Sequence, residues 1–521
     1  MADTIDEGVS PRAADDTRHA RGMRPRRPEM RIVGVLVVAA LAVALPRLHA
    51  VAARPNIVWI IVDDMSANFG CYGERLVPTP HVDRLAAEGT RFTHAFVTCP
   101  VCSPCRSALI TGMYQTSIGA HHHRSGRGVE TIHLPAGVRP VPERFREAGY
   151  FTCIGDGDEP SRSERPRAGR LGKTDYNFVW DENMYDGSDW SGRAAGQPFF
   201  MQVMLSGGKL RGGTAEAAAK LSDRAARAFG ASVRPEDVAL PPYLPRDPVL
   251  LADQAAYLDA VRFTDAAVGR VVDRLAGEGI LDDTLVIFMT DHGISHVRAK
   301  QFLYDEGTHV PLVIRGPGIE AGAVRDDLVE HIDLPALSLA AAGLPIPASM
   351  QGRDVFAPDY VPRDAVFAAR DRCDETVDRI RSVRTERFLY IRNYHPRRPL
   401  LQPNAYKDGK TILQSLRALH DAGRLAPETE RLLYSPTRPA EELYDWRADP
   451  WQVRNRADDP SLRGELDALR ARLDRWMRDT VDCGPEAEAM YDSDMRVYVG
   501  NGNAEVERNI ATMKRWAAEG R

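Results

Sequence analysis

Apolar residues gather in four short runs that predict strands buried on both faces. Each run is almost continuous in hydrophobic residues, which is typical of parallel strands covered by helices on both sides. Between residues 253 and 277 the apolar positions instead recur at helical spacing, and glycines end the pattern. Strands that alternate with helices favour an α/β sandwich with a largely parallel sheet. The four predicted strands are residues 56–62, 199–205, 284–289 and 310–315.

The pattern changes after about residue 355. Residues 379–394 alternate between apolar and polar positions, which predicts a half-exposed antiparallel hairpin. A short segment at 442–445 and an amphipathic charged helix at 462–477 follow it. We therefore expect an α/β domain over residues 54–355, a smaller α+β subdomain with an antiparallel sheet over 356–480, and a polar tail over 481–521 with one helix near 505–518.

The first 53 residues have a different character. An arginine-rich polar stretch precedes residues 32–45, which carry no charge, and small residues follow near 49–53. This order is typical of a secretory signal peptide, and the apolar stretch is shorter than the roughly 20 residues that a membrane-spanning helix needs. An uncleaved anchor helix is the alternative. Because no second long apolar run occurs in the sequence, we expect a soluble protein that is secreted or periplasmic.

Composition excludes several classes of function. The 521 residues include 68 Lys and Arg against 73 Asp and Glu, a formal net charge of −5, so nothing indicates a nucleic-acid partner. Seven cysteines are too few for a disulfide-stapled scaffold in a chain of this length. Affinity for an anion must therefore come from a local pocket. The sequence does not indicate an oligomeric state.

Two strand ends carry acidic turns. Asp63 and Asp64 follow the first predicted strand, and Asp291 with His292 follows the third. Because ligands of such folds bind at the carboxyl ends of the strands, we expect the two turns to face one crevice. Carboxylate oxygens suit Ca²⁺ or Mg²⁺. A turn cap at the strand end is the alternative role of the first pair.

Cysteines at positions 99, 102 and 105 first suggest a thiolate metal site. An iron–sulfur cluster needs a fourth cysteine at a matching interval, and a zinc site needs a second pair of ligands. The sequence lacks both. The surrounding residues offer a sharper interpretation. The segment Cys102-Ser103-Pro104-Cys105-Arg106, followed by Ala108-Leu109-Ile110-Thr111-Gly112, resembles the signature of the type I sulfatases.

This resemblance implies that Cys102 is oxidised after translation to Cα-formylglycine. The partner for that step would be a formylglycine-generating or anaerobic maturation enzyme. The cysteine, proline and arginine of the motif are present, whereas Cys105 stands where the family usually has serine. Pro104 suits the first turn of a helix, and the free N–H groups of such a turn favour an anion.

The resemblance continues from about residue 54 to residue 353. It implies an alkaline phosphatase-like sandwich with a large, mostly parallel mixed sheet flanked by helices, and a hydrolase of sulfate esters or N-sulfates. It also implies one divalent cation, Ca²⁺ in the first place and Mg²⁺ as the alternative. The implied metal ligands are Asp63, Asp64, Asp291, His292 and the modified Cys102. Further matching segments, in the family's order, are residues 54–65, 79–92, 290–293 and 300–312.

The family's mechanism implies a role for each catalytic candidate. A hydroxyl of the hydrated formylglycine, deprotonated by Asp291, attacks sulfur, and the second hydroxyl later expels sulfate. Arg106 would neutralise and orient the sulfate oxygens. Lys300 matches a sulfate-binding lysine that can also protonate the leaving group. The alternative for either basic residue is a surface ion pair.

The chain departs from the family where histidines are usual. Lys173 matches the lysine of a GK-x-H segment, but Asp175 replaces its histidine, and the strand at 199–205 runs into a turn without the second one. We take Lys209 and His122 as candidate sulfate-binding residues in their place. A triple histidine is typical of a solvated loop, so only its nearness to the motif favours His122. Other candidates are Arg211, His296, His121 and His123, and the leaving-group acid stays open.

Substrate identity rests on the charged segment 370–375. The sequence of this segment resembles that of bacterial enzymes that are compared with heparan N-sulfatases. This resemblance implies that the substrate is a sulfated carbohydrate of the glycosaminoglycan kind, such as N-sulfoglucosamine, or another small sulfate ester. A surface salt-bridge network is the alternative for this segment. Phosphodiester or phosphonate monoester hydrolysis is the alternative activity of the scaffold. A non-catalytic carbohydrate-binding relative is disfavoured because Cys102, Arg106 and Lys300 are all present.

Overall fold

Strand β1 (Asn56–Val62) explains why the first apolar run is continuous. It lies between β4 (Phe199–Leu205) and β5 (Thr284–Thr290) and runs parallel to both. Successive side chains of a strand point to opposite faces, and those of β1 alternate between two buried hydrophobic clusters. Ile57, Trp59 and Ile61 belong to one cluster, and Val58, Ile60 and Val62 to the other.

The large sheet is mixed, as expected. The computed structural model describes residues 54–157, 171–500 and 502–521, so the predicted signal peptide lies outside the described residues. Eight strands follow the order β3–β4–β1–β5–β6–β2–β7, with β8 paired to β2. β6 runs antiparallel to both of its neighbours. The remaining bounds are β2 Thr90–Phe96, β3 Phe151–Gly155, β6 His309–Arg315, β7 Ala323–Arg325 and β8 Val329–Glu330.

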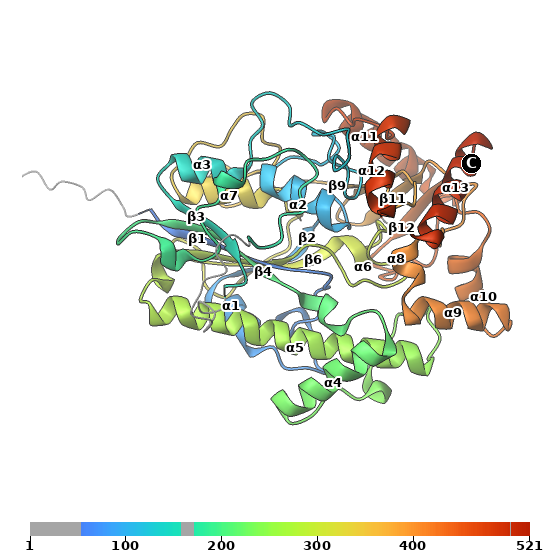
Figure 1. The fold of residues 1–521 in the computed structure, drawn as a ribbon, viewed down its shortest axis with the longest axis horizontal. Helices are drawn as coiled ribbons and strands as arrows, with labels where there is room; N and C mark the ends of the chain where they lie inside the picture. Colours follow the sequence, from blue (N-terminus) through green and yellow to red (C-terminus); the bar gives the residue numbers. More distant parts are fainter. Residues whose placement is uncertain (1–53, 158–170, 501) are drawn as a thin grey trace, which may run out of the picture. The chain divides into compact units, whose positions relative to one another are not determined.

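Helices cover both faces of this sheet, which confirms the predicted α/β sandwich (Figure 1). One cluster includes apolar side chains of three helices, α2 (Cys102–Thr111), α3 (Val141–Glu147) and α7 (Asp333–Ala341). The other cluster includes side chains of α1 (Pro80–Glu88) and α5 (Pro248–Gly277). The site therefore sits on a scaffold with two hydrophobic layers.

Helix α5 is longer than its apolar pattern suggested. Asp247 accepts hydrogen bonds from the backbone N–H groups of Val249 and Leu250, so the helix begins at Pro248. Among the residues with described positions, no helix is both long and apolar enough to cross a membrane. The shorter helices are α4 Ala215–Phe229, α6 Asp305–Thr308, α8 Ala405–Asp408, α9 Thr411–Asp421 and α10 Pro427–Thr429.

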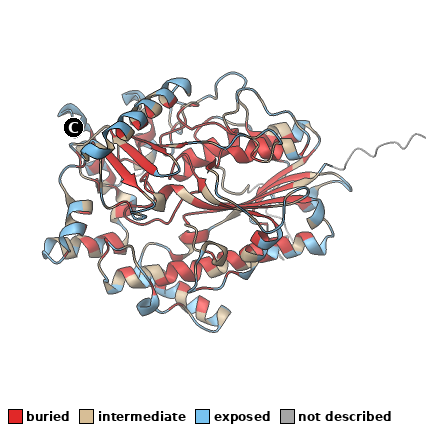
Figure 2. Cartoon of the chain, turned by 180° about the vertical axis from the view of Figure 1, so that it is seen from behind, coloured by how far each residue is buried: buried red, intermediate tan, exposed pale blue. Residues whose placement is uncertain are grey.

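A second, antiparallel sheet of four strands confirms the expected α+β subdomain. Its order is β12–β11–β10–β9, and α11 (Arg463–Asp479) packs on one face through a shared hydrophobic cluster. The predicted half-exposure of its hairpin is wrong, because the other face packs against Phe302 and Tyr304 of the first domain. Figure 2 shows these strands in the buried colour. Their bounds are β9 Val366–Arg370, β10 Ile380–Arg384, β11 Phe388–Asn393 and β12 Glu441–Asp445.

Buried ion pairs account for the misleading polar positions of this hairpin. Arg381 is fully buried and binds Asp371 at 2.9 Å and Asp482 at 2.5 Å. Arg384 pairs with Asp305. A buried charge is tolerated only with such partners. The alternation of charged and apolar residues in this hairpin therefore reflects arginines that are buried in ion pairs. It does not indicate a face exposed to solvent.

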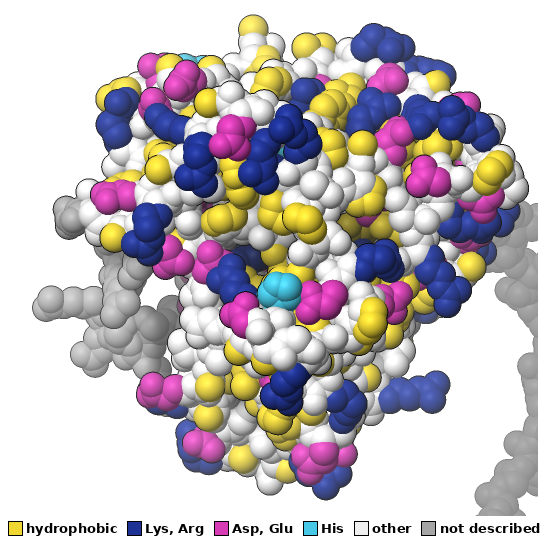
Figure 3. All heavy atoms as spheres, turned by 90° about the vertical axis from the view of Figure 1, so that its right-hand side faces the viewer, with side chains coloured by type: hydrophobic (Ala, Val, Ile, Leu, Met, Phe, Trp, Pro, Cys, Tyr) yellow, Lys and Arg dark blue, Asp and Glu magenta, His cyan; other side chains and the backbone are white. Residues whose placement is uncertain are grey.

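The tail forms two helices, α12 (Glu488–Val499) and α13 (Ala504–Ala518), of which only the second was expected. Helix α12 is held by polar contacts that leave no apolar pattern, since Asp494 is buried and binds Arg372 at 2.7 Å. On the face that carries α9, α10 and α13, basic and acidic side chains are interspersed (Figure 3). That face has no extended patch of one charge.

Gly208 allows the turn after β4 to cross close to the ends of β1. An added Cβ there would lie 2.0 Å from the carbonyl oxygen of Asp64, closer than any real contact. Gly208→Ala should therefore lower the free energy of unfolding by about 1–3 kcal/mol, measured by denaturant titration. Gly213→Ala is the control, because its nearest contact would be Lys410 Cγ at 3.6 Å. Equal stability of the two variants would contradict this account.

Candidate active site

The site is built where helix α2 begins, beside the carboxyl ends of β1 and β5. Helix α2 starts at Cys102, with Pro104 in its first turn, as the motif predicted. Cys105 fastens this turn to the sheet, because its Sγ donates to the carbonyl oxygen of Asp291 at 2.8 Å. His331 Nε2 lies 3.0 Å from the carbonyl oxygen of Cys105.

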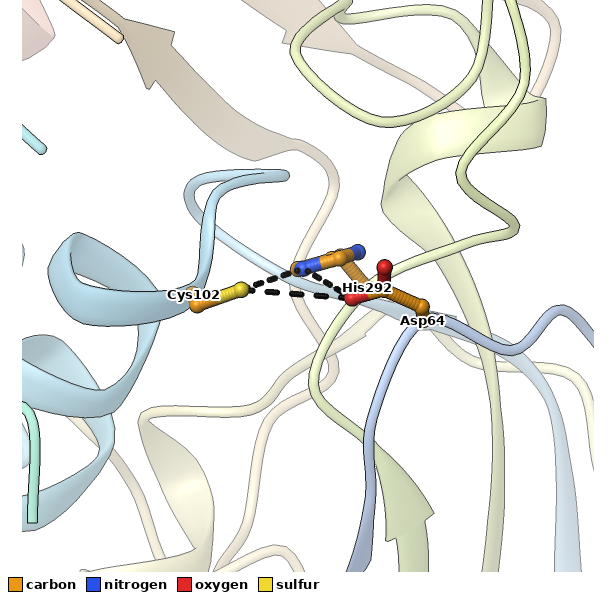
Figure 4. A group of neighbouring side chains, drawn as sticks. All are labelled: Asp64, Cys102 and His292. Atoms are coloured by element: carbon orange, nitrogen blue, oxygen red, sulfur yellow. Dashed lines mark hydrogen bonds and ion pairs between the residues drawn. The ribbon is translucent and has the colours of Figure 1, made fainter. Parts of the chain in front are cut away.

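The two acidic turns do face one crevice. Asp64 adopts a left-handed conformation with φ 52°, and its backbone N–H donates to Asp291 Oδ1 at 3.1 Å. His292 Nε2 lies 3.4 Å from Asp64 Oδ1 and 3.5 Å from Asp291 Oδ1. The sulfur of Cys102 is 3.3 Å from the same nitrogen (Figure 4). Four of the five predicted metal ligands therefore meet around one point.

Asp63 faces the basic residues of the motif. Arg106 Nη2 donates to Asp63 and, at 3.1 Å, to Asp291 Oδ2, which links the two turns. Lys173 Nζ lies 3.1 Å from Asp63 Oδ2, and Lys209 also pairs with that carboxylate. The structure thus brings both predicted sulfate-binding lysines to the centre.

Lys300 binds the second carboxylate of the first acidic turn. Its ammonium group donates to both carboxylate oxygens of Asp64, at 2.9 and 3.1 Å, and lies 3.3 Å from the sulfur of Cys102. Tyr406, from α8 of the subdomain, places its ring 5.1 Å from this ammonium group. Sequence reasoning missed Tyr406, because no motif surrounds it.

Positive charge keeps the buried carboxylates ionised. Burial by itself would raise the pKa of Asp63, but Arg106, Lys173 and Lys209 together hold that pKa well below its usual value. The pKa of Asp64 is also lowered, because nearby cations outweigh the effect of burial. Ionised oxygens are what a hard cation binds.

The same surroundings favour negative charge at position 102. Burial raises the pKa of the Cys102 thiol, whereas Lys173, Lys300 and His292 lower it, and the pKa falls to about 7. The pocket therefore stabilises a negative charge at the side chain of residue 102.

The residues present fit a divalent cation. The ligand atoms of Asp64, Cys102 and His292 all lie within 4.8 Å of one another. Asp291 contacts this group through His292. Asp63 is linked to Asp291 because Arg106 pairs with both carboxylates. Carboxylates dominate the set, which suits Ca²⁺ or Mg²⁺, while His292 contributes one nitrogen.

Exposure distinguishes the mouth of the site from its floor. The side chains of Lys173 and Lys209 are 27% and 35% exposed, against 3% for Arg106 and 5% for Lys300. Beside Lys173 opens a cleft of about 550 Å³, lined among others by Asp175, Tyr176, Trp180 and Arg127. An anionic substrate would enter from this side.

The structure places the remaining candidates elsewhere. The His121–His123 run is buried, so the expectation of a solvated loop is wrong. The rings of His122 and His121 lie 4.1 Å apart and are tilted by 43°, and His122 Nδ1 lies 4.0 Å from Glu486. No hydrogen bond or ion pair between described residues joins His122 to Cys102. Arg211 and His296 both pair with Asp253, and no hydrogen bond or ion pair between described residues joins either of them to the two acidic turns.

The charged segment 370–375 is not a surface network. All six residues are at most 4% exposed. Arg370 pairs with Asp378, and Arg372 pairs with Glu486 at 2.6 Å. The segment is therefore buried, and four of its five charged residues form ion pairs inside the protein.

Comparison with known proteins agrees with this geometry. A family model described as Sulfatase matches residues 55–344, and one described as N-sulphoglucosamine sulphohydrolase, C-terminal, matches residues 292–399. An ulvan-active sulfatase of Formosa agariphila is 31% identical over 503 residues, covering 86% of this chain and 81% of the relative. Human N-sulphoglucosamine sulphohydrolase is 28% identical over 478 residues, covering 83% of this chain and 93% of the relative.

Solved structures share the fold. A 2-O GAG sulfatase superposes with a TM-score of 0.59 at 19% identity, covering 82% of this chain and 93% of the other. A phosphonate monoester hydrolase from Silicibacter pomeroyi gives a TM-score of 0.54 at 17% identity, covering 82% and 96%. These likenesses concern the fold alone. The family model, however, spans more than half of the chain, and the Formosa relative is matched over most of its length, so this chain belongs to the sulfatase family.

Proposed function

We propose that this sulfatase removes sulfate from a sulfated carbohydrate, with Cys102 converted to formylglycine and one Ca²⁺ held by the acidic turns. The observation that carries the proposal is the meeting of Cys102, Asp64 and His292 beside Lys300 and Arg106. Asp63 and Asp291 complete the proposed ligand set. The bound cation would polarise a sulfate oxygen and lower the cost of charge in the transition state.

The chain's own residues supply charge and proton transfer. Arg106 and Lys300, which are both buried, would bind the sulfate oxygens; their contacts with Asp291 and with Cys102 support this role. Lys173 and Lys209, which are partly exposed, would guide the anion into the crevice. Asp291, held by Arg106 and by the backbone of Asp64, is the proposed base for the nucleophile.

Electrostatic balance supports an anionic substrate. Four carboxylates, including Asp175, face four permanently positive side chains in the crevice. A bound divalent cation adds two positive charges to this nearly neutral group. The site would then attract a sulfate ester and stabilise the additional charge of its transition state. The phosphonate alternative has only the likeness of fold in its favour.

The proposed substrate class rests on relatives and on the cleft. The matched relatives are named for ulvan and for N-sulphoglucosamine. The cleft beside Lys173 offers the partly exposed Trp180 for packing against a sugar ring. We also propose secretion or a periplasmic location, which the basic and apolar pattern of residues 1–53 favours.

Cys102→Ala should abolish turnover with folding retained, because it removes the only group that can become the aldehyde. Mass spectrometry of the wild-type peptide should show a residue about 18 Da lighter than cysteine. Cys105→Ser is the matched control, since a serine hydroxyl can still donate to the carbonyl oxygen of Asp291. Wild-type turnover with an unmodified thiol would refute the nucleophile.

Removal of divalent cations should lower both activity and thermal stability. Three buried carboxylates would lose a shared counter-charge, and a ligand at 100 times its Kd stabilises a protein by about 2.7 kcal/mol. Thermal melting with a chelator, and again after Ca²⁺ or Mg²⁺ is restored, measures the change apart from activity. A melting temperature that is indifferent to chelation would contradict the metal site.

Sulfate release from a panel of sulfated mono- and disaccharides should identify the linkage. We expect turnover of at least one O- or N-sulfated glycan carrying an amino sugar or uronic acid. A matched panel of phosphonate and phosphate diesters serves as the comparison. Faster turnover of the phosphorus esters would favour the alternative activity.

A further inference from the structure

A second cluster of buried reactive side chains lies outside the acidic centre. His123, Cys373 and Asp374 place their ligand atoms within 4.8 Å of one another, and each residue is at most 6% exposed. His123 Nδ1 is 2.9 Å from Asp374 Oδ1. The backbone N–H of Asp374 also lies 3.3 Å from Nδ1, but the shorter contact with the carboxylate favours the ring proton on Nδ1. No hydrogen bond with a described residue engages Nε2, which leaves that atom for chemistry.

The backbone holds this pair in place. Asp374 adopts φ 51°, a left-handed conformation that is uncommon outside glycine. Arg372 donates to the carbonyl oxygens of both His123 and Asp374, each at 2.9 Å. The guanidinium is held in turn by Glu486 and Asp494 of the tail. Uncommon conformations that several contacts enforce cluster at functional sites.

The pair adjoins the first turn of α2. The backbone N–H of Arg124, the residue after His123, donates to Ser103 Oγ at 2.9 Å. Cys373 shares a small hydrophobic cluster with Cys99 and Val101, so the chain neighbours of His123 and of Asp374 both contact residues next to position 102.

Charged residues of the centre also face the ring. Lys300 and Asp175 both act electrostatically on His123. Lys300 lies 3.3 Å from the sulfur of Cys102, and Asp175 lies 3.6 Å from Arg106 Nε. His123 therefore lies within electrostatic reach of Lys300, which contacts Cys102, and of Asp175, which contacts Arg106. His122 instead contacts His121 and Glu486.

Resting on the proposed function, we propose that His123 is the acid that protonates the leaving group and that Asp374 is its positioning residue. The bond between sulfur and the leaving oxygen or nitrogen breaks, and its electron pair stays on the leaving atom. That atom takes the proton from Nε2. The ring becomes neutral, keeps Nδ1–H on Asp374, and regains a proton from water. Lys300, by contrast, directs its donors at Asp64 and residue 102.

The direction of the pH dependence follows from the surroundings of the ring. Burial lowers the pKa of His123, and Asp374 opposes this only in part. Since the acid needs its proton, its contribution is present below that pKa and lost as pH rises through it. The groups that face the pair are Asp374, Cys373, Arg124, Lys300, Asp175 and, from α12, Tyr498.

His123→Gln should separate substrates by their leaving groups. For a sulfated sugar that the wild type cleaves, kcat/KM should fall 10²- to 10⁴-fold, because a sugar oxygen or nitrogen leaves poorly without a proton. For 4-nitrophenyl sulfate the loss should stay within a few-fold, since nitrophenolate leaves unprotonated. The decline of sugar-sulfate turnover toward high pH should also disappear. Equal losses on both substrates, or an unchanged pH profile, would overturn the proposal.

Three variants complete the test. Asp374→Asn should give a smaller selective loss and move the decline to lower pH, because the ring loses its anionic partner. Cys373→Ala should leave the ratio of the two substrates unchanged; a loss equal to that of His123→Gln would indicate a metal site and overturn the proposal. His309→Gln, at a half-buried histidine whose Nε2 lies 2.7 Å from the carbonyl oxygen of Thr93, controls for general damage. A wild type that cleaves neither ester would refute the proposed function instead.

Discussion

Burial of several carboxylates at one end of the sheet is the constraint on which this structure depends. Asp63, Asp64 and Asp291 are almost without solvent, and each needs a cation within reach. Removing one partner of a buried ion pair costs about 3–5 kcal/mol, because an uncompensated charge remains. The cationic partners come from separate elements, since Arg106 lies on α2 and Lys300 lies in the loop before α6. The fold and the site therefore stabilise each other.

Buried ion pairs also connect the small subdomain and the tail to residues beyond the two acidic turns. Arg372 links three parts of the chain, since it binds the backbone at His123 and Asp374 and the carboxylates of Glu486 and Asp494. The tail is therefore linked, through Arg372, to the segments that carry His123 and Asp374. Its polar composition reflects ion pairs that are satisfied inside the protein, and it gives the neighbouring loop a fixed position.

The positive side chains of the crevice differ in how far they are exposed to solvent. The most buried positive groups lie on its floor, where low dielectric strengthens their effect on charge. Lys173 and Lys209 are more exposed and lie at the mouth, beside an open cleft with aromatic residues. An anionic group on a larger molecule can thus reach the floor while the rest of the molecule remains in the cleft.

The local sequence determined the central strands, the start of α2 at Cys102 and the convergence of two acidic turns, because hydrophobic period, a proline in a first turn and strand-end position are short-range properties. It misjudged segment 370–375 and the His121–His123 run, whose charges and rings look solvated in isolation. Only the tertiary structure decided their burial, since the partners lie far along the chain: His123 and Asp374 are joined across 251 residues. Long-range ion pairs leave no periodic trace in sequence, so their geometry emerges only when the chain is folded.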